Sequence, residues 1–144
     1  MNQTQHIAVV DDEQPAREMV GDYLRMHGFS VSLCDGGASL RQLIAQKMPD
    51  LIVLDLNMPH WDGWTAFSKL ERVTPLLPVI VITARPNQYR KAVQLGVDAF
   101  MEKPLNIPIL VRAIQRLTSE DKNCHVRRIT KRAFVTQLLD NTGS

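Results

Sequence analysis

The strongest constraint on the fold is a fivefold alternation of short apolar runs with stretches of helical periodicity. The apolar runs hold four to six residues each and end at polar or turn-forming residues, as strands do. They span residues 6–10, 29–34, 51–54, 79–82 and 97–101, and helical spacing follows over 16–27, 38–47, 64–72, 88–95 and 107–117. This alternation favours parallel strands joined by right-handed crossovers, in an open α/β sheet with helices on both faces.

The apolar runs differ in how deeply we expect them to be buried. Residues 51–54 are apolar throughout, which is typical of a strand covered on both faces, and they end at one carboxylate, Asp55. Residues 29–34 alternate between apolar and polar, which predicts a strand with one wetter face at the edge of the sheet. A carboxylate at the end of a buried strand needs a partner, because ionised groups are seldom removed from water alone.

Length and composition limit the class of protein. A chain of 144 residues is about one domain, and 44% hydrophobic with 22% charged residues is ordinary for a soluble protein. No apolar run approaches the roughly 18–20 residues of a membrane span, and no secretion signal opens the sequence, so we expect a cytoplasmic protein. Cys34 and Cys124 lie far apart in the sequence, and we interpret them as free thiols.

Polar residues at the ends of the predicted strands should meet in one crevice. In open α/β sheets, ligands bind outside the carboxyl ends of the strands, which gathers Asp11, Asp12, Asp55, Thr83 and Lys103. Three carboxylates placed together raise one another's pKa unless a cation lies among them. Oxygen ligands without sulfur or imidazole favour Mg²⁺ over zinc.

Thr83 and Lys103 indicate a chemistry beyond metal binding. An ammonium, a hydroxyl donor and a divalent cation around one carboxylate are the groups that hold a phosphoryl group during transfer. Asp55 would then be the nucleophile that forms an aspartyl phosphate. Ala84, which is small and next to Thr83, leaves room for the phosphoryl group.

Four motifs at these strand ends resemble the receiver domain of bacterial two-component response regulators. They are Val9-Val10-Asp11-Asp12-Glu13, Leu54-Asp55-Leu56-Asn57-Met58-Pro59, Ile82-Thr83-Ala84 and Glu102-Lys103-Pro104. Each motif alone is weak, and the four in this order and spacing are specific. The resemblance covers residues 6–118 and implies a receiver domain over residues 1–118. Its implied fold is the flavodoxin-like (βα)5 receiver fold, a doubly wound five-stranded parallel sheet with strand order 2-1-3-4-5.

The resemblance also implies roles for the metal and the partners. Asp55 would accept a phosphoryl group from the phosphohistidine of a sensor histidine kinase or phosphotransfer protein. Asp12 and Asp55 would bind Mg²⁺ directly, Asp11 would act through water, and the backbone carbonyl of Asn57 would be a further ligand. The chain would be a phosphoacceptor that catalyses its own phosphorylation and dephosphorylation, and not an enzyme acting on other substrates.

The same resemblance implies a conformational switch. Thr83 and Lys103 would bind the phosphoryl oxygens, and Phe100 would be the aromatic that turns inward when Thr83 moves. The surface of the fourth helix, fifth strand and fifth helix would then change and serve as the output face, or as the face of a homodimer. Arg85, two positions after Thr83, and Asn57, two after Asp55, would tune the loss of phosphate. The Lys103–Pro104 bond would be cis.

The tail, residues 119–144, allows two interpretations. It holds five basic and three acidic residues, followed by apolar side chains near 134–139. The tail is either a linker or extra helix that leads to an output domain or a partner, or a solvated, partly ordered terminus. No recognition helix can be identified in it, so we expect no direct nucleic-acid binding by this chain.

Two other classes of protein share part of this pattern. A Mg²⁺-dependent phosphatase of the haloacid dehalogenase type also uses an Asp nucleophile with Thr and Lys, but it needs a second Asp where this chain has Asn57. A flavin-binding module has the same architecture, but its phosphate-cradling Ser, Thr and Gly clusters are missing from the strand-end loops. Trp61 and Trp64 are expected to be loop cover and core, not a stacking platform.

Overall fold

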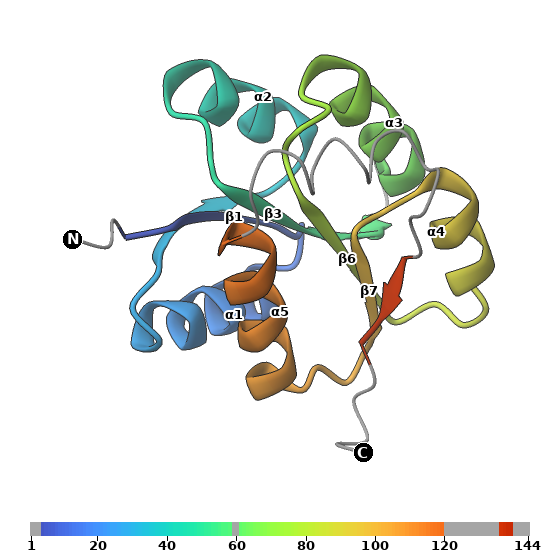
Figure 1. Ribbon diagram of the computed structural model, residues 1–144. Coiled ribbons are helices and arrows are strands. Elements are labelled where there is room, and N and C mark those ends of the chain that lie inside the picture. The colour runs from blue at the N-terminus through green and yellow to red at the C-terminus, as the bar shows by residue number, and fades with distance from the viewer. Residues whose placement is uncertain (1–3, 59–60, 120–135, 140–144) are drawn as a thin grey trace.

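The computed structural model describes residues 4–58, 61–119 and 136–139. One sheet forms the centre, and helices cover both of its faces (Figure 1). Its strands are β1 (His6–Val10), β2 (Ser30–Cys34), β3 (Leu51–Asp55), β6 (Val79–Thr83), β7 (Ala99–Glu102) and β8 (Gln137–Leu138). The helices are α1 (Gln14–Met26), α2 (Gly37–Gln46), α3 (Gly63–Val73), α4 (Tyr89–Leu95) and α5 (Ile107–Ser119).

The order of the sheet is β2-β1-β3-β6-β7-β8, and all of its strands are parallel. The first five strands of this sheet, counted along the chain as β1, β2, β3, β6 and β7, therefore lie in the predicted order 2-1-3-4-5, and the flavodoxin-like α/β fold is confirmed. β2 lies at one edge, as its alternating sequence predicted, and it is only partly buried. The three central strands β1, β3 and β6 are buried along their whole length.

The core has two layers, one on each face of the sheet. Neighbouring strand residues point to opposite faces, so Ile80 packs in the layer of α1 and α5 while Val81 packs in the layer of α2, α3 and α4. Figure 1 shows the two helix layers on opposite sides of the strands. Each fully buried side chain of this kind contributes about 1.5–3 kcal/mol relative to an exposed one. Continuous apolar strands thus provide a rigid support for the residues that follow them.

Three short strands were not predicted. β4 (Asn57–Met58) and β5 (Trp61–Asp62) form an antiparallel pair in the loop after Asp55. In the tail, where we expected a linker, an extra helix or a solvated, partly ordered terminus, residues 137 and 138 form β8, a sixth strand beside β7. A strand of two residues is too short to show a recognisable hydrophobic period. Its position depends on the strand edge with which it pairs, which the local sequence does not show. The rest of the predicted tail, residues 120–135 and 140–144, lies outside the described residues.

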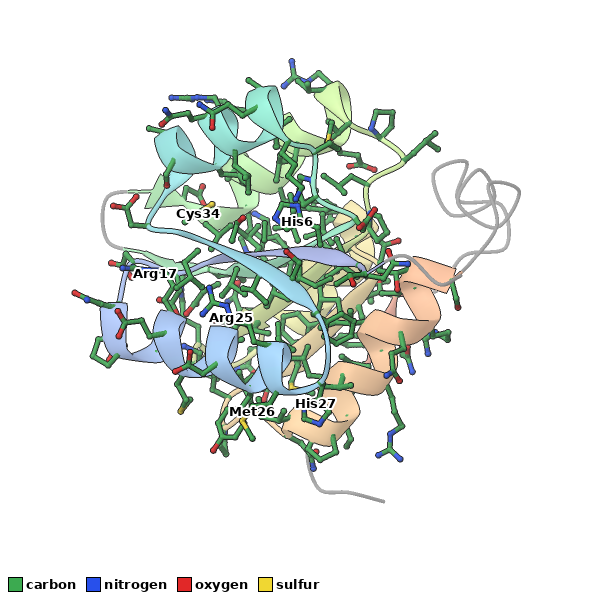
Figure 2. The ribbon with its side chains drawn as sticks, turned by 90° about the vertical axis from the view of Figure 1, so that its left-hand side faces the viewer. His6, Arg17, Arg25, Met26, His27 and Cys34 are labelled. Atoms are coloured by element: carbon green, nitrogen blue, oxygen red, sulfur yellow. The ribbon has the colours of Figure 1, made fainter. Side chains whose placement is uncertain are left out.

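His6 and Cys34 are buried side chains that can titrate. Figure 2 shows His6 on β1 and Cys34 at the end of β2, both within the body of the fold. Cys34 is a buried free thiol, as predicted, and Cys124 lies outside the described residues. Within the described ranges, no helix has the length and apolar character needed to cross a bilayer.

Candidate functional site

The carboxyl end of β3 carries Asp55, and its nearest described cation is Lys103. Asp55 is the last residue of β3 and is 1% exposed, and Lys103 directly follows β7. The Lys103 Nζ donates a hydrogen bond to Asp55 Oδ2 over 2.7 Å, although 48 residues separate the two in sequence. Parallel pairing through β6 brings the ends of β3 and β7 to the same edge. The carboxylate at the end of the buried strand thus has the partner that its burial requires.

Asp11 is the second carboxylate of this site. It directly follows β1 and is 2% exposed. Its Oδ1 accepts a hydrogen bond from the backbone N–H of Glu13 over 2.9 Å. Its Oδ2 is buried without a hydrogen-bond partner among the described residues, and it lies 3.8 Å from Lys103 Nζ. A buried carboxylate oxygen in this state is free to accept a bond from water or to bind a cation.

The electrostatics of the site follow from two buried carboxylates that share one ammonium. Burial raises the pKa of Asp11 to about 6, and the charge of Asp55 adds to this effect while the Glu13 N–H and Lys103 oppose it. Burial lowers the pKa of Lys103, but the hydrogen bond and charge of Asp55 outweigh it, so the pKa is raised overall. Lys103 therefore stays protonated, and it only partly offsets the negative charge of the pair.

Thr83 ends the strand next to Asp55. It is the last residue of β6, is fully buried, and its Oγ1 accepts a hydrogen bond from the backbone N–H of Arg85 over 2.9 Å. The Arg85 guanidinium donates to the carbonyl of Leu56 over 2.7 Å. The connection from β6 to α4 is therefore tied both to Thr83 and to the residue after Asp55.

The structure brings together fewer carboxylates than the sequence suggested. Asp12 is exposed, and the described part of the chain has no group of three or more His, Cys, Asp or Glu residues placed to hold a metal. Asn57 has its backbone in β4, and its side chain is not described. Phe100 is already fully buried, with its ring centroid 5.8 Å from that of Tyr89. The inward rotation that the resemblance implies for Phe100 would therefore begin from a side chain that already points into the core.

Sequence reasoning missed one residue near the site. The Arg17 guanidinium donates to the backbone carbonyl of Asp11 over 2.7 Å and thereby fixes the loop between β1 and α1. Its signal in the sequence is weak, since an arginine in the first turns of a helix is ordinarily solvated.

The Lys103–Pro104 peptide bond is cis, as the resemblance implied.

The donor set fits a hard divalent cation. Asp11 and Asp55 offer carboxylate oxygens, and Asp11 Oδ2 has no hydrogen-bond partner among the described residues and lies 3.8 Å from Lys103 Nζ. Mg²⁺ prefers such oxygens and keeps several waters, so it needs few protein ligands.

A comparison with protein families decides the assignment. The model of the response regulator receiver domain matches residues 7–115, which include the three strand ends that carry Asp11, Asp55 and Lys103. The chain belongs to this receiver domain family. Receiver domains are signalling phosphoacceptors and generally use Mg²⁺ for phosphorylation.

Curated relatives of this receiver domain are response regulators. "Response regulator MprA" of Mycobacterium sp. (strain KMS) is 36% identical over 121 residues, which are 81% of this chain and 53% of that protein. "Transcriptional regulatory protein GlrR" of Escherichia coli (strain K12) is 29% identical over 142 residues, 94% of this chain and 32% of that protein. The chain thus spans about half of the first relative and a third of the second. These relatives are response regulators and not phosphatases of the haloacid dehalogenase type, so they do not support the alternative assignment.

Solved structures agree with the fold. The receiver domain of NtrX from Brucella abortus is 28% identical, with a TM-score of 0.73 over 80% of this chain and 99% of that one. The receiver domain described here is therefore similar in extent to a receiver solved by itself.

Proposed function

We propose that Asp55 accepts a phosphoryl group from a phosphohistidine and that its phosphorylation state controls an output. The observation that carries this proposal is the buried Asp55 carboxylate, held by the Lys103 ammonium over 2.7 Å at the carboxyl edge of the sheet. An ammonium hydrogen-bonded to a nucleophile is also placed to bind the group that the nucleophile receives.

The transfer would form one bond and break another. An Asp55 carboxylate oxygen forms the new P–O bond while the N–P bond of the phosphohistidine breaks, and the departing imidazole recovers its electron pair and takes up a proton. Lys103 binds one phosphoryl oxygen and the Thr83 hydroxyl donates to another. Burial of Asp55 and Thr83 strengthens these interactions, because water competes less at the site.

The proposed cofactor is Mg²⁺. Asp12, Asp55 and the backbone carbonyl of Asn57 would bind the ion directly and Asp11 would act through water, with Asp12 turning in from its exposed position. When bound, the ion supplies positive charge for the phosphoryl oxygens. The orphan oxygen of Asp11 supports its inclusion in this set.

The proposed partners are a sensor histidine kinase or a phosphotransfer protein upstream, and an output domain or protein downstream. Because the relatives are about two to three times as long as the matched region, this output belongs to the proposal and not to the family assignment. Thr83 and Phe100 would transmit the change to α4, β7 and α5, where a homodimer could form. Response regulators are typically cytoplasmic, and we propose the same location.

Phosphorylation can be tested with a small phosphodonor such as acetyl phosphate and Mg²⁺. We expect intact-mass spectrometry to show one added phosphoryl group on the wild type and none on Asp55→Asn. Asp35→Asn is the matched control, because Asp35 also directly follows a strand, β2, but is exposed. Equal labelling of the wild type and Asp55→Asn would refute Asp55 as the acceptor.

The enzymatic alternative has its own test. We expect no sustained release of phosphate from an excess of phosphomonoester, because its alkoxide is a much poorer leaving group than the imidazole of a phosphohistidine and should not phosphorylate Asp55. Repeated turnover that is lost in Asp55→Asn would favour an enzyme that acts on external substrates.

A further inference from the structure

The outer edge of β7 is covered by the chain's own C-terminal segment. β8 runs parallel to β7, and Leu138 lies opposite Phe100 (Figure 1, red arrow). The backbone N–H of Gln137 donates to the Asp98 carbonyl over 3.3 Å, and that of Leu139 donates to the Phe100 carbonyl over 2.7 Å. Backbone pairing of this kind is how extended peptides bind a free sheet edge.

Side chains of the segment fill both layers of the core. Thr136 is 2% exposed, and its hydroxyl donates to the Ala92 carbonyl of α4 over 3.4 Å. Leu139 is 4% exposed and packs in the layer of α5, whereas Leu138 between them is 50% exposed. The segment therefore inserts two side chains, on opposite sides of the sheet edge.

A single tyrosine links this segment to the switch region. The Tyr89 hydroxyl donates to the backbone carbonyl of Thr136 over 2.9 Å, while the Tyr89 ring contacts the ring of Phe100. Tyr89 is the first residue of α4 and is reached from Thr83 through the short connection that Arg85 ties in place. The residue after β7 is Lys103, which is bonded to Asp55. The segment is thus attached to α4, which follows Thr83 in the chain, and to β7, which precedes Lys103.

Phosphorylation would alter these attachments. To donate to a phosphoryl oxygen on Asp55, the Thr83 hydroxyl must turn toward β3, which shifts the oxygen that the Arg85 N–H uses as acceptor. The connection then rearranges, and with it the start of α4, where Tyr89 holds Thr136. Since the segment has two described backbone bonds to β7, loss of the Tyr89 bond would remove a considerable share of its polar attachments.

We propose that the β7 edge beside α4 is a docking site for an extended segment, that residues 136–139 are its ligand in the resting chain, and that phosphorylation of Asp55 releases them. This inference rests on the proposed phosphorylation of Asp55. While the segment is docked, the edge of β7 is closed to a second copy of this chain, so release is a precondition for pairing through that edge.

Hydrogen exchange tests the release directly. Beryllium fluoride with Mg²⁺ serves as the phosphoryl mimic, and its binding is monitored separately by ¹⁹F NMR. In the wild type we expect amide exchange over residues 136–139 to become at least severalfold faster on binding, with no change in Asp55→Asn. Binding with unchanged exchange would overturn the docking proposal alone. No binding to the wild type would instead overturn the proposed function.

Linkage supplies a second test. If phosphorylation releases the segment, then weakening its docking must tighten beryllium fluoride binding by the matching factor. We expect Leu139→Ser to bind the mimic severalfold more tightly than the wild type, and the exposed neighbour Leu138→Ser to bind as the wild type does. Tyr89→Phe, which removes only the hydroxyl that holds Thr136, should act in the same direction as Leu139→Ser. Equal affinities for all four proteins would refute the coupling.

Discussion

The buried charge of Asp11 costs stability. Its carboxylate is buried, and raising a carboxyl pKa from 3.8 to about 6 corresponds to at most about 3 kcal/mol at neutral pH. We predict that Asp11→Asn stabilises the metal-free protein by about 1–3 kcal/mol, because the amide keeps the bond from the Glu13 N–H and carries no charge. Urea unfolding at pH 7.5 with a chelator would measure this gain.

The same substitution should weaken Mg²⁺ binding, which can be followed by Trp fluorescence. Asp22→Asn provides the matched control, because Asp22 is an exposed carboxylate on α1 that pairs only with Arg25 across the surface. A loss of stability in Asp11→Asn would contradict the view that burial of this charge is unfavourable.

The titration of the buried His6 imidazole should make the stability of the protein depend on pH. Burial, together with the charge of Lys47, lowers the pKa of His6 below 6.5, and Asp50 only partly opposes this. The folded state therefore keeps the imidazole neutral, while the unfolded state takes up a proton near pH 6.5. Stability is present above this pH and is lost as pH falls toward and through the folded pKa. We predict that the His6 contribution to the unfolding free energy falls between pH 7.5 and 5.5, opposite in sign to that of Asp11, whose raised pKa lets the folded state take up a proton over the same range.

The His6 contribution can be isolated by substitution. His6→Gln cannot titrate, so its unfolding free energy should fall less steeply over the same pH range, even if it is less stable at pH 7.5 through loss of the 2.7 Å contact with the Ser32 hydroxyl. Urea titrations at several pH values would measure both slopes. Parallel slopes would show that His6 is not a source of the pH dependence.

At the scale of single elements, α3 is positioned by a glycine. A Cβ on Gly63 would lie 2.9 Å from the Leu56 Cα and 2.7 Å from its side chain, so α3 begins in close contact with the residue after Asp55. We predict that Gly63→Ala destabilises the fold by about 1–3 kcal/mol, because backbone atoms must move apart. Thermal unfolding would measure this loss.

Gly36→Ala is the matched control for Gly63→Ala. Gly36 precedes α2 in extended backbone, and a Cβ there would meet nothing within 4 Å. We expect it to change stability by no more than about 0.5 kcal/mol. Similar effects of the two substitutions would rule out close contact at Leu56 as the reason for glycine at 63.

Across the whole molecule, stability should decrease from the centre of the sheet to its edges. β1, β3 and β6 are buried along their length, while β2 is partly exposed and β8 consists of two exposed residues between buried ones. We predict that amides of the three central strands exchange only on global unfolding, and that those of β2 and β8 exchange through local opening. Native-state hydrogen exchange by mass spectrometry would measure this order. Protection of β8 equal to that of β3 would contradict it.

The sequence by itself determined the alternating strands and helices, their parallel order and the strand ends that carry Asp11, Asp55, Thr83 and Lys103. It could do so because burial imposes periodicity on each element and because parallel strands end at a common edge. The sequence could not show that Asp11 is buried and Asp12 exposed, since two adjacent side chains on a loop have no period that distinguishes them.

Only the tertiary structure showed that residues 136–139 of the tail pair with β7 and bury two side chains. Thr136 and Leu139 are buried because β7 offers unpaired backbone groups and because α4 and α5 leave room on either side of its edge. Neither condition can be recognised from the sequence of the tail, because both depend on β7, α4 and α5. Likewise, the 2.7 Å contact between Lys103 and Asp55 depends on three strands from distant parts of the chain. Local patterns can thus predict the elements, whereas contacts across the sheet require the packed molecule.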